Sequence, residues 1–329
     1  MRRILTSVFA ILLALVLVGA AWFAYAIWGD RSRPQSAAQI IVPRGATFHD
    51  IAAQLARADI VTNPTALRIY AKLTRADTTA HAGAYRFQAH QTAADILAQL
   101  QSGGAQVAKW VTIPEGFTAK QIAQRLQDEG FGSAQAYAAA FLHDSIVIDG
   151  TRTKNLEGYL FPSTYLIPNG ATPKTVEHIL TAQFRKELPP DAARSARAHH
   201  LTVPQVVTLA SLIEREAKAD DERALMAGVY YNRLRLGMPL EVDATIEYAL
   251  AQHHDVITYE DLKLDSPYNT YRHDGLPPTP IANPGEASLQ AAFHPRPSPY
   301  LYYVYKGNGH HAFARTLAEQ SANVAKYLK

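Results

Sequence analysis

The chain has 329 residues, of which 48% are apolar and 19% charged, a composition typical of a globular protein with two or three domains. Its 32 basic residues nearly balance 29 acidic ones, and no long basic run or nucleic-acid-binding signature occurs, which argues against binding of DNA or RNA. The absence of cysteine rules out disulfides and thiolate metal sites, and fits either a reducing or an oxidising compartment.

An apolar segment opens the chain. Residues 4–28 carry no charge, and a helix of that length can span the ~30 Å hydrocarbon core of a bilayer. The only charges before it are Arg2 and Arg3, so the positive-inside rule places the N-terminus in the cytoplasm. A cleaved signal peptide is the competing interpretation, because Ala-Tyr-Ala at 24–26 resembles a cleavage site, but the apolar run is long for one. We therefore expect residues 1–30 to be an uncleaved single-pass anchor in the cytoplasmic membrane.

A repeated pattern follows a polar linker at 31–39. Residues 40–55 and 111–126 share Pro-x-Gly-x-Thr-x-x-x-Ile-Ala-x-x-Leu, and residues 91–100 carry a shorter version. Each full copy predicts a strand, a turn at Pro-x-Gly, and a helix that buries its Ile and Leu, four and eight positions after the threonine. A local fold without any ligand would explain a single copy equally well. The predicted helix caps are Thr47, Thr92 and Thr118.

The predicted elements divide into two domains, which gives an α+β protein. Residues 40–107 are expected to form a small α+β module, with a further strand at 83–87 and a helix closed by glycines at 103 and 104. Residues 108–329 are expected to form a larger mixed α+β domain. Its helices are predicted near 134–142, 174–187, 202–219, 221–236, after Asp243, and at 285–292 and 316–328, with a hairpin over 298–314 that turns at 307–309.

A long irregular segment, residues 266–288, interrupts the large domain and holds five of the chain's 19 prolines. Long loops inside compact domains are usually functional. Tyr268, Asn269 and Tyr271 give this segment the aromatic faces and amide groups that a sugar-binding cleft needs. The same residue types also build ordinary surface loops.

The helix predicted over 201–219 is apolar on nearly every side and yet contains Glu214 and Glu216. At 100° per residue their side chains point ~200° apart, so they cannot share one face. A buried carboxyl needs a partner or a raised pKa, and a pKa near neutral is what a general acid requires. The alternative is that each glutamate pairs with an arginine such as Arg223.

Five motifs occur in order in the second half of the chain. They are NLEGYLFPSTY (155–165), TLASLIEREA (208–217), VYYNRL-x-x-GMPLEVDATIEYA (229–249), SPYNTY-x-x-x-GLPPTPIANPG (266–285) and HP-x-x-x-PYLYYV (294–304). With these motifs the sequence resembles the YceG-like family of membrane-anchored endolytic murein transglycosylases. The module at 40–107 is similar to LysM-type peptidoglycan-binding modules, which place Pro-x-Gly-x-Thr before a helix.

The resemblance implies a lyase that cuts peptidoglycan glycan strands between MurNAc and GlcNAc without water, leaving 1,6-anhydroMurNAc ends and terminating the elongation of nascent strands. One glutamate protonates the glycosidic oxygen and then takes the proton of the MurNAc C6 hydroxyl, which closes the anhydro ring. Because this nucleophile belongs to the substrate, one carboxyl can suffice where ordinary glycosidases use two. The resemblance implies no cofactor, a catalytic domain on the periplasmic side, and peptidoglycan synthases as partners.

Glu216 is the expected acid, because a small residue follows it, as in lytic transglycosylases, and because it lies nearer the helix end, where a cleft can reach it. Glu214 is then a supporting carboxylate or the alternative acid, and Glu157 in the first motif is expected to orient a loop. The residues expected to line the cleft are Asn232, Asp243, Thr245, Tyr268, Asn269 and Tyr271.

The chain's 13 histidines, including pairs at 199–200, 253–254 and 310–311, show no metal-ligand spacing, so no metal site is expected. The alternative function is a non-catalytic glycan-binding scaffold of the cell-wall synthesis machinery, because the Pro-x-Gly-x-Thr module would serve either protein. Anhydro-ended products from purified glycan strands distinguish the enzyme from the scaffold.

Overall fold

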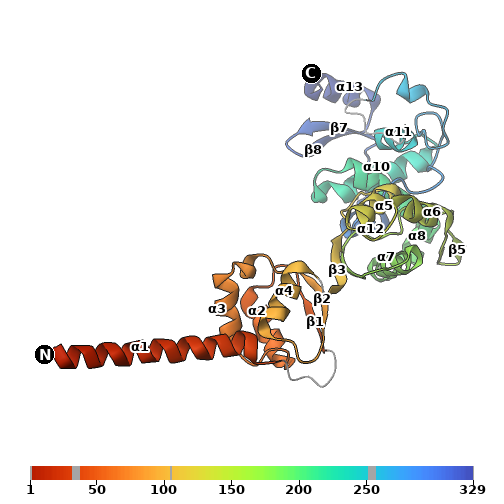
Figure 1. The fold of residues 1–329 in the computed structure, drawn as a ribbon. Coiled ribbons are helices and arrows are strands. Elements are labelled where there is room, and N and C mark those ends of the chain that lie inside the picture. The colour runs from red at the N-terminus through yellow and green to blue at the C-terminus, as the bar shows by residue number, and fades with distance from the viewer. Residues whose placement is uncertain (1, 32–37, 104–105, 251–256, 329) are drawn as a thin grey trace. The chain divides into compact units, whose positions relative to one another are not determined.

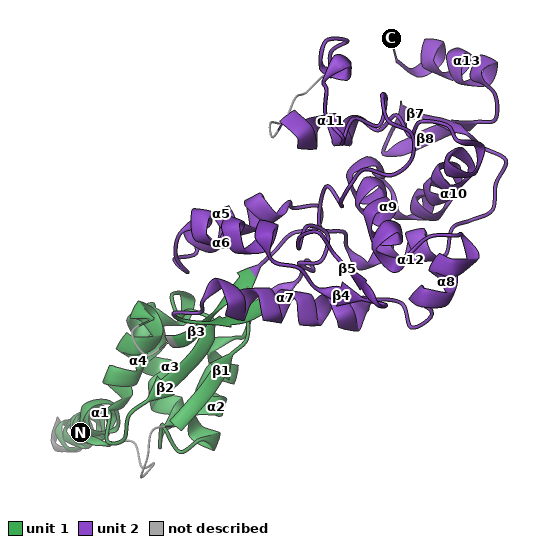
Figure 2. Cartoon of the chain, turned by 90° about the vertical axis from the view of Figure 1, so that its right-hand side faces the viewer, with its two compact units in different colours: residues 1–111, 165–169 green, residues 112–164, 170–329 purple. Residues whose placement is uncertain are grey.

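The computed structural model describes residues 2–31, 38–103, 106–250 and 257–328. The chain divides into two compact units, a small one of residues 1–111 with 165–169 and a large one of residues 112–164 with 170–329 (Figure 2). Most of the predicted linker, one of the two helix-closing glycines and the histidine pair at 253–254 lie outside the described residues.

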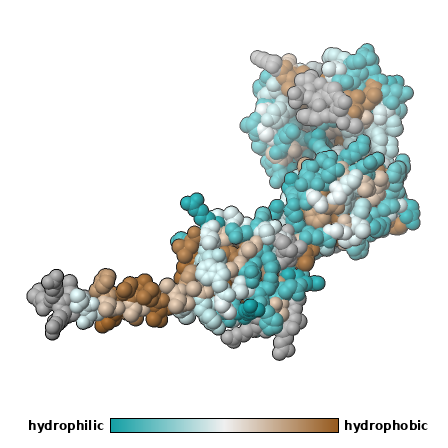
Figure 3. All heavy atoms as spheres, in the orientation of Figure 1, coloured by the Kyte–Doolittle hydropathy of each residue, from teal (hydrophilic) through white to brown (hydrophobic). Residues whose placement is uncertain are grey.

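The N-terminal apolar segment is helical, as predicted. Helix α1 spans Arg2–Ala24 and continues as a short π-helix, η1, over Tyr25–Gly29 (Figure 1). Among the described residues, Thr6–Gly29 is the one helical stretch long and apolar enough to cross a membrane. Large apolar side chains are exposed along much of this helix (Figure 3).

The small unit is built on a four-stranded sheet with the strand order β1-β2-β3-β6. Its strands are β1 (Ala38–Val42), β2 (Gly83–Phe87), β3 (Gln106–Thr112) and β6 (Thr164–Pro168), and its helices are α2 (Phe48–Arg57), α3 (Pro64–Leu73), η2 (Ala76–Thr78) and α4 (Ala93–Ser102). β2 pairs antiparallel with both β1 and β3. The expected domain boundary at residue 107 falls within β3, and β6 joins this sheet from much later in the chain.

The three predicted capping threonines do cap helices. Thr47, Thr92 and Thr118 each accept a hydrogen bond from the backbone N–H three residues on. The side chain at that third position accepts in return from the threonine's own N–H, which completes a capping box. The isoleucine and leucine of each copy are buried. The repeat therefore encodes the same local structure in both units.

The end of the N-terminal apolar helix closes the core of the small unit. Ile27 is fully buried and packs in one apolar cluster with residues such as Leu67 and Ile96. The Trp28 ring meets the Tyr70 ring edge-on, with 5.3 Å between centroids. The end of the N-terminal helical segment and the rest of the small unit therefore share a core.

The large unit surrounds one apolar helix, α9 (Val203–Glu216), in which nine of 14 residues are buried. Its other helices are α5 (Ala119–Asp128), α6 (Ala134–His143), α7 (Pro173–Glu187), α8 (Ala192–Ala198), α10 (Asp220–Leu236), α11 (Asp243–Leu250), η3 (Asp261–Lys263), α12 (Glu286–Phe293) and α13 (Leu317–Tyr327). Its hairpins are β4 (Val147–Ile148) with β5 (Thr151–Arg152), and β7 (Tyr302–Gly307) with β8 (His310–Ala314).

Most predicted elements of the large unit match these bounds within a few residues, and residues 266–285 are irregular as expected. Two boundaries differ. Helix α9 ends at Glu216 rather than at residue 219, because Ala217 turns to an extended conformation and caps the helix. Helix α11 includes Asp243 as its first residue, whereas the helix was expected to begin after it.

Replacing Thr47 by alanine tests the capping box of α2. The variant Thr47→Ala removes the oxygen that accepts from the Asp50 N–H at 3.3 Å. We expect the unfolding free energy of the small unit to fall by about 1 kcal/mol, measured by denaturant unfolding. Thr47→Ser keeps the hydroxyl and is expected to behave like the unmodified chain. Equal stability of all three proteins would mean that the cap contributes nothing.

Candidate active site

Helix α9 brings its two glutamates into different surroundings. The Glu214 side chain is 7% exposed, lies 3.5 Å from a guanidinium nitrogen of Arg223, and accepts the backbone N–H of Gly285 at 3.1 Å. Arg223 is itself buried and also donates to Asp220 and Ser288. A buried guanidinium supplies the counter-charge that a buried carboxylate needs. Glu214 is thus one half of an ion pair.

The turn of the second repeat lies against Glu214. A Cβ atom added to Gly116 would come within 3.7 Å of the Glu214 Cγ, and one added to Gly285 would meet Glu115 Oε1 at 2.1 Å. Only glycine at 285 therefore allows Glu115 to approach this closely. Burial, with the nearby charge of Glu214, raises the pKa of Glu115. The Pro-x-Gly turn thus adds a second carboxyl to the polar cluster around Arg223.

Glu216 has a different partner set. It is partly exposed, takes part in none of the ion pairs found between described residues, and its Oε2 accepts the Tyr303 hydroxyl at 3.0 Å. The Tyr303 hydroxyl in turn lies 2.7 Å from that of the fully buried Tyr230. Burial raises the pKa of Glu216 to about 7, against the hydrogen bond from Tyr303, and the charge of Asp243 adds to the rise. A carboxyl with this pKa keeps its proton in a large share of molecules at neutral pH.

The start of helix α11 lies beside Glu216. A backbone hydrogen bond from Ala244 reaches the Glu216 carboxyl and opposes the rise of its pKa. Asp243, the first residue of the helix, is exposed and accepts the Tyr271 hydroxyl at 2.5 Å. Burial, followed by the bond to Asp243, raises the pKa of Tyr271. The long loop at 266–288 is thereby tied to the start of helix α11, beside Glu216.

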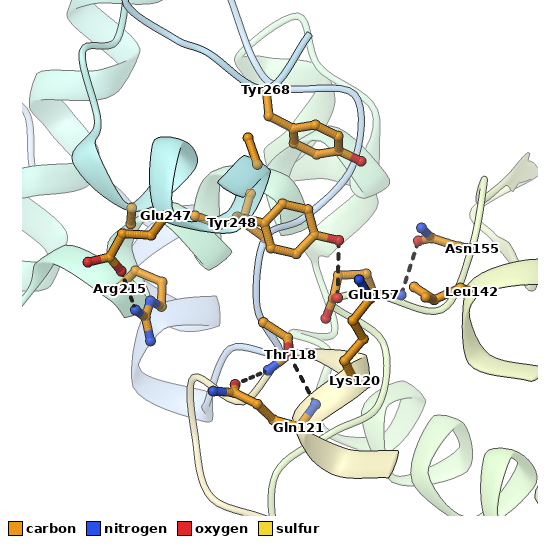
Figure 4. A pocket seen from close by; sticks show the side chains of 13 residues that line it. Thr118, Lys120, Gln121, Leu142, Asn155, Glu157, Arg215, Glu247, Tyr248 and Tyr268 are labelled. Carbon is orange, nitrogen blue, oxygen red and sulfur yellow. Dashed lines mark hydrogen bonds and ion pairs between the residues drawn. The ribbon is translucent and has the colours of Figure 1, made fainter. Parts of the chain in front are cut away.

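A cavity of about 490 Å³ opens within the large unit, between the start of α5, the turn at 155–157 and helix α11 (Figure 4). Tyr248 and Tyr268 contribute aromatic rings to its wall, and Lys120 contributes an ammonium group. The ion pair of Arg215 with Glu247, at 2.8 Å, also lines it. Neither Glu214 nor Glu216 lines this cavity, although Ala244 and Arg215, which adjoin Glu216, do. Polar, charged and aromatic groups on one concave wall suit a carbohydrate ligand.

Glu157 is a second carboxyl, besides Glu247, that lines the cavity. It is 1% exposed, and one oxygen accepts the Ala119 N–H at 2.8 Å and the Asn283 amide at 3.0 Å. Its other oxygen accepts the Tyr248 hydroxyl at 3.2 Å, as Figure 4 shows. Burial raises the pKa of Glu157 to about 7, although all three hydrogen bonds favour the charged form. Because its oxygens are occupied by protein donors, Glu157 holds segments together, in agreement with the expected role in orienting a loop.

Asn283 extends the same network. Its amide oxygen accepts the backbone N–H groups of Gly158 and Leu160, at 3.0 and 2.8 Å. Its amide nitrogen donates to the Phe117 carbonyl at 2.8 Å as well as to Glu157. One side chain therefore joins the second repeat, the NLEGY turn and the long loop.

The predicted cleft residues fall into two groups. Asp243 and Tyr271 lie together beside Glu216, and Tyr268 lines the cavity, with its hydroxyl 2.7 Å from that of Thr279. The side chains of the second group form hydrogen bonds to other parts of the protein.

In that second group, Thr245 is fully buried and donates to the Val242 carbonyl. Asn269 is also fully buried, and its amide donates to the carbonyls of residues 262 and 264. The Asn232 amide holds the carbonyls of residues 298 and 300. These three side chains shape the large unit, and contact with a ligand stays a prediction for each of them.

Sequence reasoning missed Tyr303, Tyr230 and Glu115. Tyr303 belongs to the PYLYYV motif, but nothing in the spacing of that motif indicates that it meets a glutamate 87 residues earlier. Within the described part of the chain, no three His, Asp or Glu side chains gather in a way that could hold a metal ion.

The fold and the site together define an α+β protein with an N-terminal apolar helix and a protonatable, partly buried glutamate beside an aromatic loop. A family model described as the YceG-like family matches residues 40–326, so the chain belongs to the YceG-like family.

Two curated proteins with sequences similar to this chain share one name. The chain is 33% identical over 307 residues to the endolytic murein transglycosylase of Bacillus subtilis strain 168, covering 88% of this chain and 84% of that protein. It is 31% identical to the protein of the same name in Streptococcus pneumoniae D39, covering 97% of this chain but 64% of that longer protein. The crystal structure of a putative yceG-like protein from Listeria monocytogenes matches with a TM-score of 0.59 and 28% identity, over 88% of this chain and 99% of that one.

The stability of the chain should depend on Glu157 in a defined pH window. The folded protein holds this proton up to about pH 7, whereas a glutamate with the ordinary pKa of 4.5 releases it earlier. The folded state therefore binds more protons between these values, and stability falls as pH rises through them, by about 3 kcal/mol for this group. Glu157→Gln cannot ionise, so we expect a smaller decline in unfolding free energy between pH 4.5 and 7. An unchanged decline would contradict the assignment.

Proposed function

We propose that the chain is an endolytic murein transglycosylase, a lyase that cuts peptidoglycan glycan strands internally. The observation that carries the proposal is Glu216: a partly buried carboxyl with a pKa of about 7, outside every ion pair found in the described residues, and beside an aromatic loop. The names of the curated relatives support the same activity.

In the proposed reaction the protonated Glu216 gives its proton to the oxygen between MurNAc and GlcNAc. The bond from the MurNAc anomeric carbon to that oxygen breaks, and positive charge develops on the sugar ring. The exposed carboxylate of Asp243 supplies negative charge close by. The ionised Glu216 then takes the proton of the MurNAc C6 hydroxyl, whose oxygen attacks the anomeric carbon and forms the 1,6-anhydro ring. Glu216 ends the cycle protonated, and no water is consumed.

The hydrogen bond from Tyr303 gives Glu216 a fixed orientation during both proton transfers. It stabilises the ionised carboxylate between the two steps and lowers the pKa of Glu216, while burial raises it. The balance leaves the pKa near neutral, which is the best value for a group that must act first as an acid and then as a base.

Glu214 supports this site from the other side of the helix. It holds Arg223 and the backbone of Gly285, and so fixes the end of the long loop against α9. Because Arg223 and the Gly285 N–H already engage the Oε2 atom of Glu214, the acid role is assigned to Glu216.

The proposal places the chain in the cytoplasmic membrane with its N-terminus inside and the large unit on the periplasmic side. Residues 1–30 act as the anchor, the LysM-like module at 40–107 holds glycan, and the catalytic domain at 108–329 cuts it. Cutting of nascent strands would end their elongation, and peptidoglycan synthases are the proposed partners. The apolar helix is the structural support for the anchor.

The second candidate is a non-catalytic glycan-binding scaffold. The observation that favours it is that the cavity of about 490 Å³ is not lined by Glu216. A scaffold would bind isolated cell walls without cutting them, and would do so after loss of both glutamates.

Exchange of Glu216 for glutamine tests the acid assignment. Glu216→Gln keeps the shape of the side chain but has no proton to donate, so we expect cleavage of uncrosslinked glycan strands to fall by roughly 100-fold to 10,000-fold. Glu214→Gln on the same helix is the matched control and is expected to cut strands. Mass spectrometry of the products counts anhydro ends in each case. An active Glu216→Gln protein with an inactive Glu214→Gln protein would reverse the two roles, and reducing ends in place of anhydro ends would mean hydrolysis.

The pH profile of cleavage tests the same group independently. Because the first step needs the proton of Glu216, the rate is expected to fall as pH rises through about 7. Tyr303→Phe removes a hydrogen bond that lowers this pKa, so the falling limb should move to higher pH. Tyr302→Phe alters the neighbouring residue of the same strand, whose side chain points the other way, and should leave the limb in place. If the falling limb of the pH profile does not move in Tyr303→Phe, the hydrogen bond from Tyr303 does not set the pKa of the catalytic acid.

A further inference from the structure

Helix α3 of the small unit exposes large apolar side chains to solvent. Its buried side contributes Leu67 to the core of the unit. On its outer side Ile69 is 46% exposed and Leu73 is 73% exposed. These two residues are four apart, so they lie one above the other on one face. Trp28, at the end of the anchor, is 54% exposed and contacts Tyr70 of the same helix. We call Trp28, Ile69 and Leu73 the apolar strip.

Cations accompany the apolar strip. Arg68, Lys72 and Arg75 are all exposed, on or directly after α3. Asp77 is the single acidic residue in the sequence from 64 to 79, so the segment has an excess of positive charge. Apolar side chains next to lysine and arginine are typical of helices that lie in the headgroup region of an anionic bilayer.

The small unit holds α3 at a fixed position relative to the anchor. Ile27 is part of the core of the unit, and the Asp30 carboxylate accepts the hydroxyl of Thr62, just before α3. Helix α3 lies on the side of the small unit from which α1 projects, and it crosses the direction of α1 (Figure 1). A bilayer spanned by α1 would therefore run parallel to α3.

We propose that the outer face of α3 docks on the anionic lipid surface of the membrane that α1 spans. The apolar strip enters the interface, and Arg68, Lys72 and Arg75 bind phosphate headgroups. The inference rests on the membrane anchor of the proposed function, and it adds that the small unit lies on the bilayer instead of swinging free above it.

Depth-dependent fluorescence quenching tests the docking. Because the chain has no cysteine, a single introduced cysteine gives one labelling site in the full chain. Leu73→Cys probes the docked face, and Leu12→Cys probes the middle of the anchor. Arg86→Cys is the matched control, because Arg86 is exposed on β2 between the buried Tyr85 and Phe87 and so faces away from the helices. Each protein carries an environment-sensitive dye in vesicles of phosphatidylcholine and phosphatidylglycerol with nitroxide lipids.

We expect shallow nitroxide lipids to quench the dye at 73, deep ones to quench it at 12, and neither to quench it at 86. Changing Arg68, Lys72 and Arg75 together to glutamine should lower the quenching at 73 at least twofold, as should vesicles without phosphatidylglycerol. Quenching at 12 with none at 73 would overturn the docking and leave the anchor intact. If the dye at 73 is protected from aqueous iodide but is not quenched by nitroxide lipids, this face of α3 is covered by a protein. That result would also overturn the docking on lipid. Loss of quenching at 12 would overturn the anchor and the docking together.

Discussion

Two carboxyls at the end of an apolar helix impose the constraint on which the large unit depends. Removing a carboxylate from water is costly unless a counter-charge, donors or a proton compensate it. Helix α9 uses both solutions, two residues apart. Arg223 and the Gly285 N–H compensate Glu214, while the pKa of Glu216 is raised to about 7, so that a large share of molecules holds this proton at neutral pH. The partners of Glu214 belong to α10 and to the start of α12, so the ion pair also joins the helices that pack on α9.

The irregular segments around the cavity are ordered by a small number of buried polar side chains. Asn283 and Glu157 together satisfy backbone groups at residues 117, 119, 158 and 160. Gly158 adopts a φ of +88°, and a Cβ there would lie 2.4 Å from Pro280, so the two segments can approach this closely only with glycine at this position. Buried hydrogen bonds and one close glycine contact therefore fix the irregular segments around the cavity to one another.

Much of the fold was predicted from local sequence signals, because the interactions behind these signals involve residues only a few positions apart. The capping threonines, the apolar periodicity of α9 and the glycine turn of the β7–β8 hairpin are of this kind. Helix α3 escaped prediction because its buried side is built mainly from alanine, although Asn63 and Pro64 mark its start. Strand β6 could not be assigned to the small unit from sequence, because its partner β3 lies more than 50 residues earlier.

The site was predicted only in part, because some of its features have local causes and others depend on contacts between distant segments. Helical geometry indicated that Glu214 and Glu216 face different environments, and their partner sets do differ. Which glutamate meets an arginine and which a tyrosine depends on contacts between distant segments, such as the bond from Tyr303. No local pattern carries that information, and the family motifs indicated only that these segments belong to one site.

The burial of Ile27 has a consequence for processing and for soluble fragments. A signal peptidase that cut after Ala26 would remove this buried alanine and place a new, charged N-terminus on Ile27, inside the apolar core of the small unit. Because a charged group is costly to bury, cleavage at this site would destabilise the core of the small unit. A recombinant fragment that starts in the linker lacks Ile27 and has a cavity at that place in its core. Weak glycan binding by such a fragment would therefore be explained by a damaged module as well as by a module without affinity for glycan.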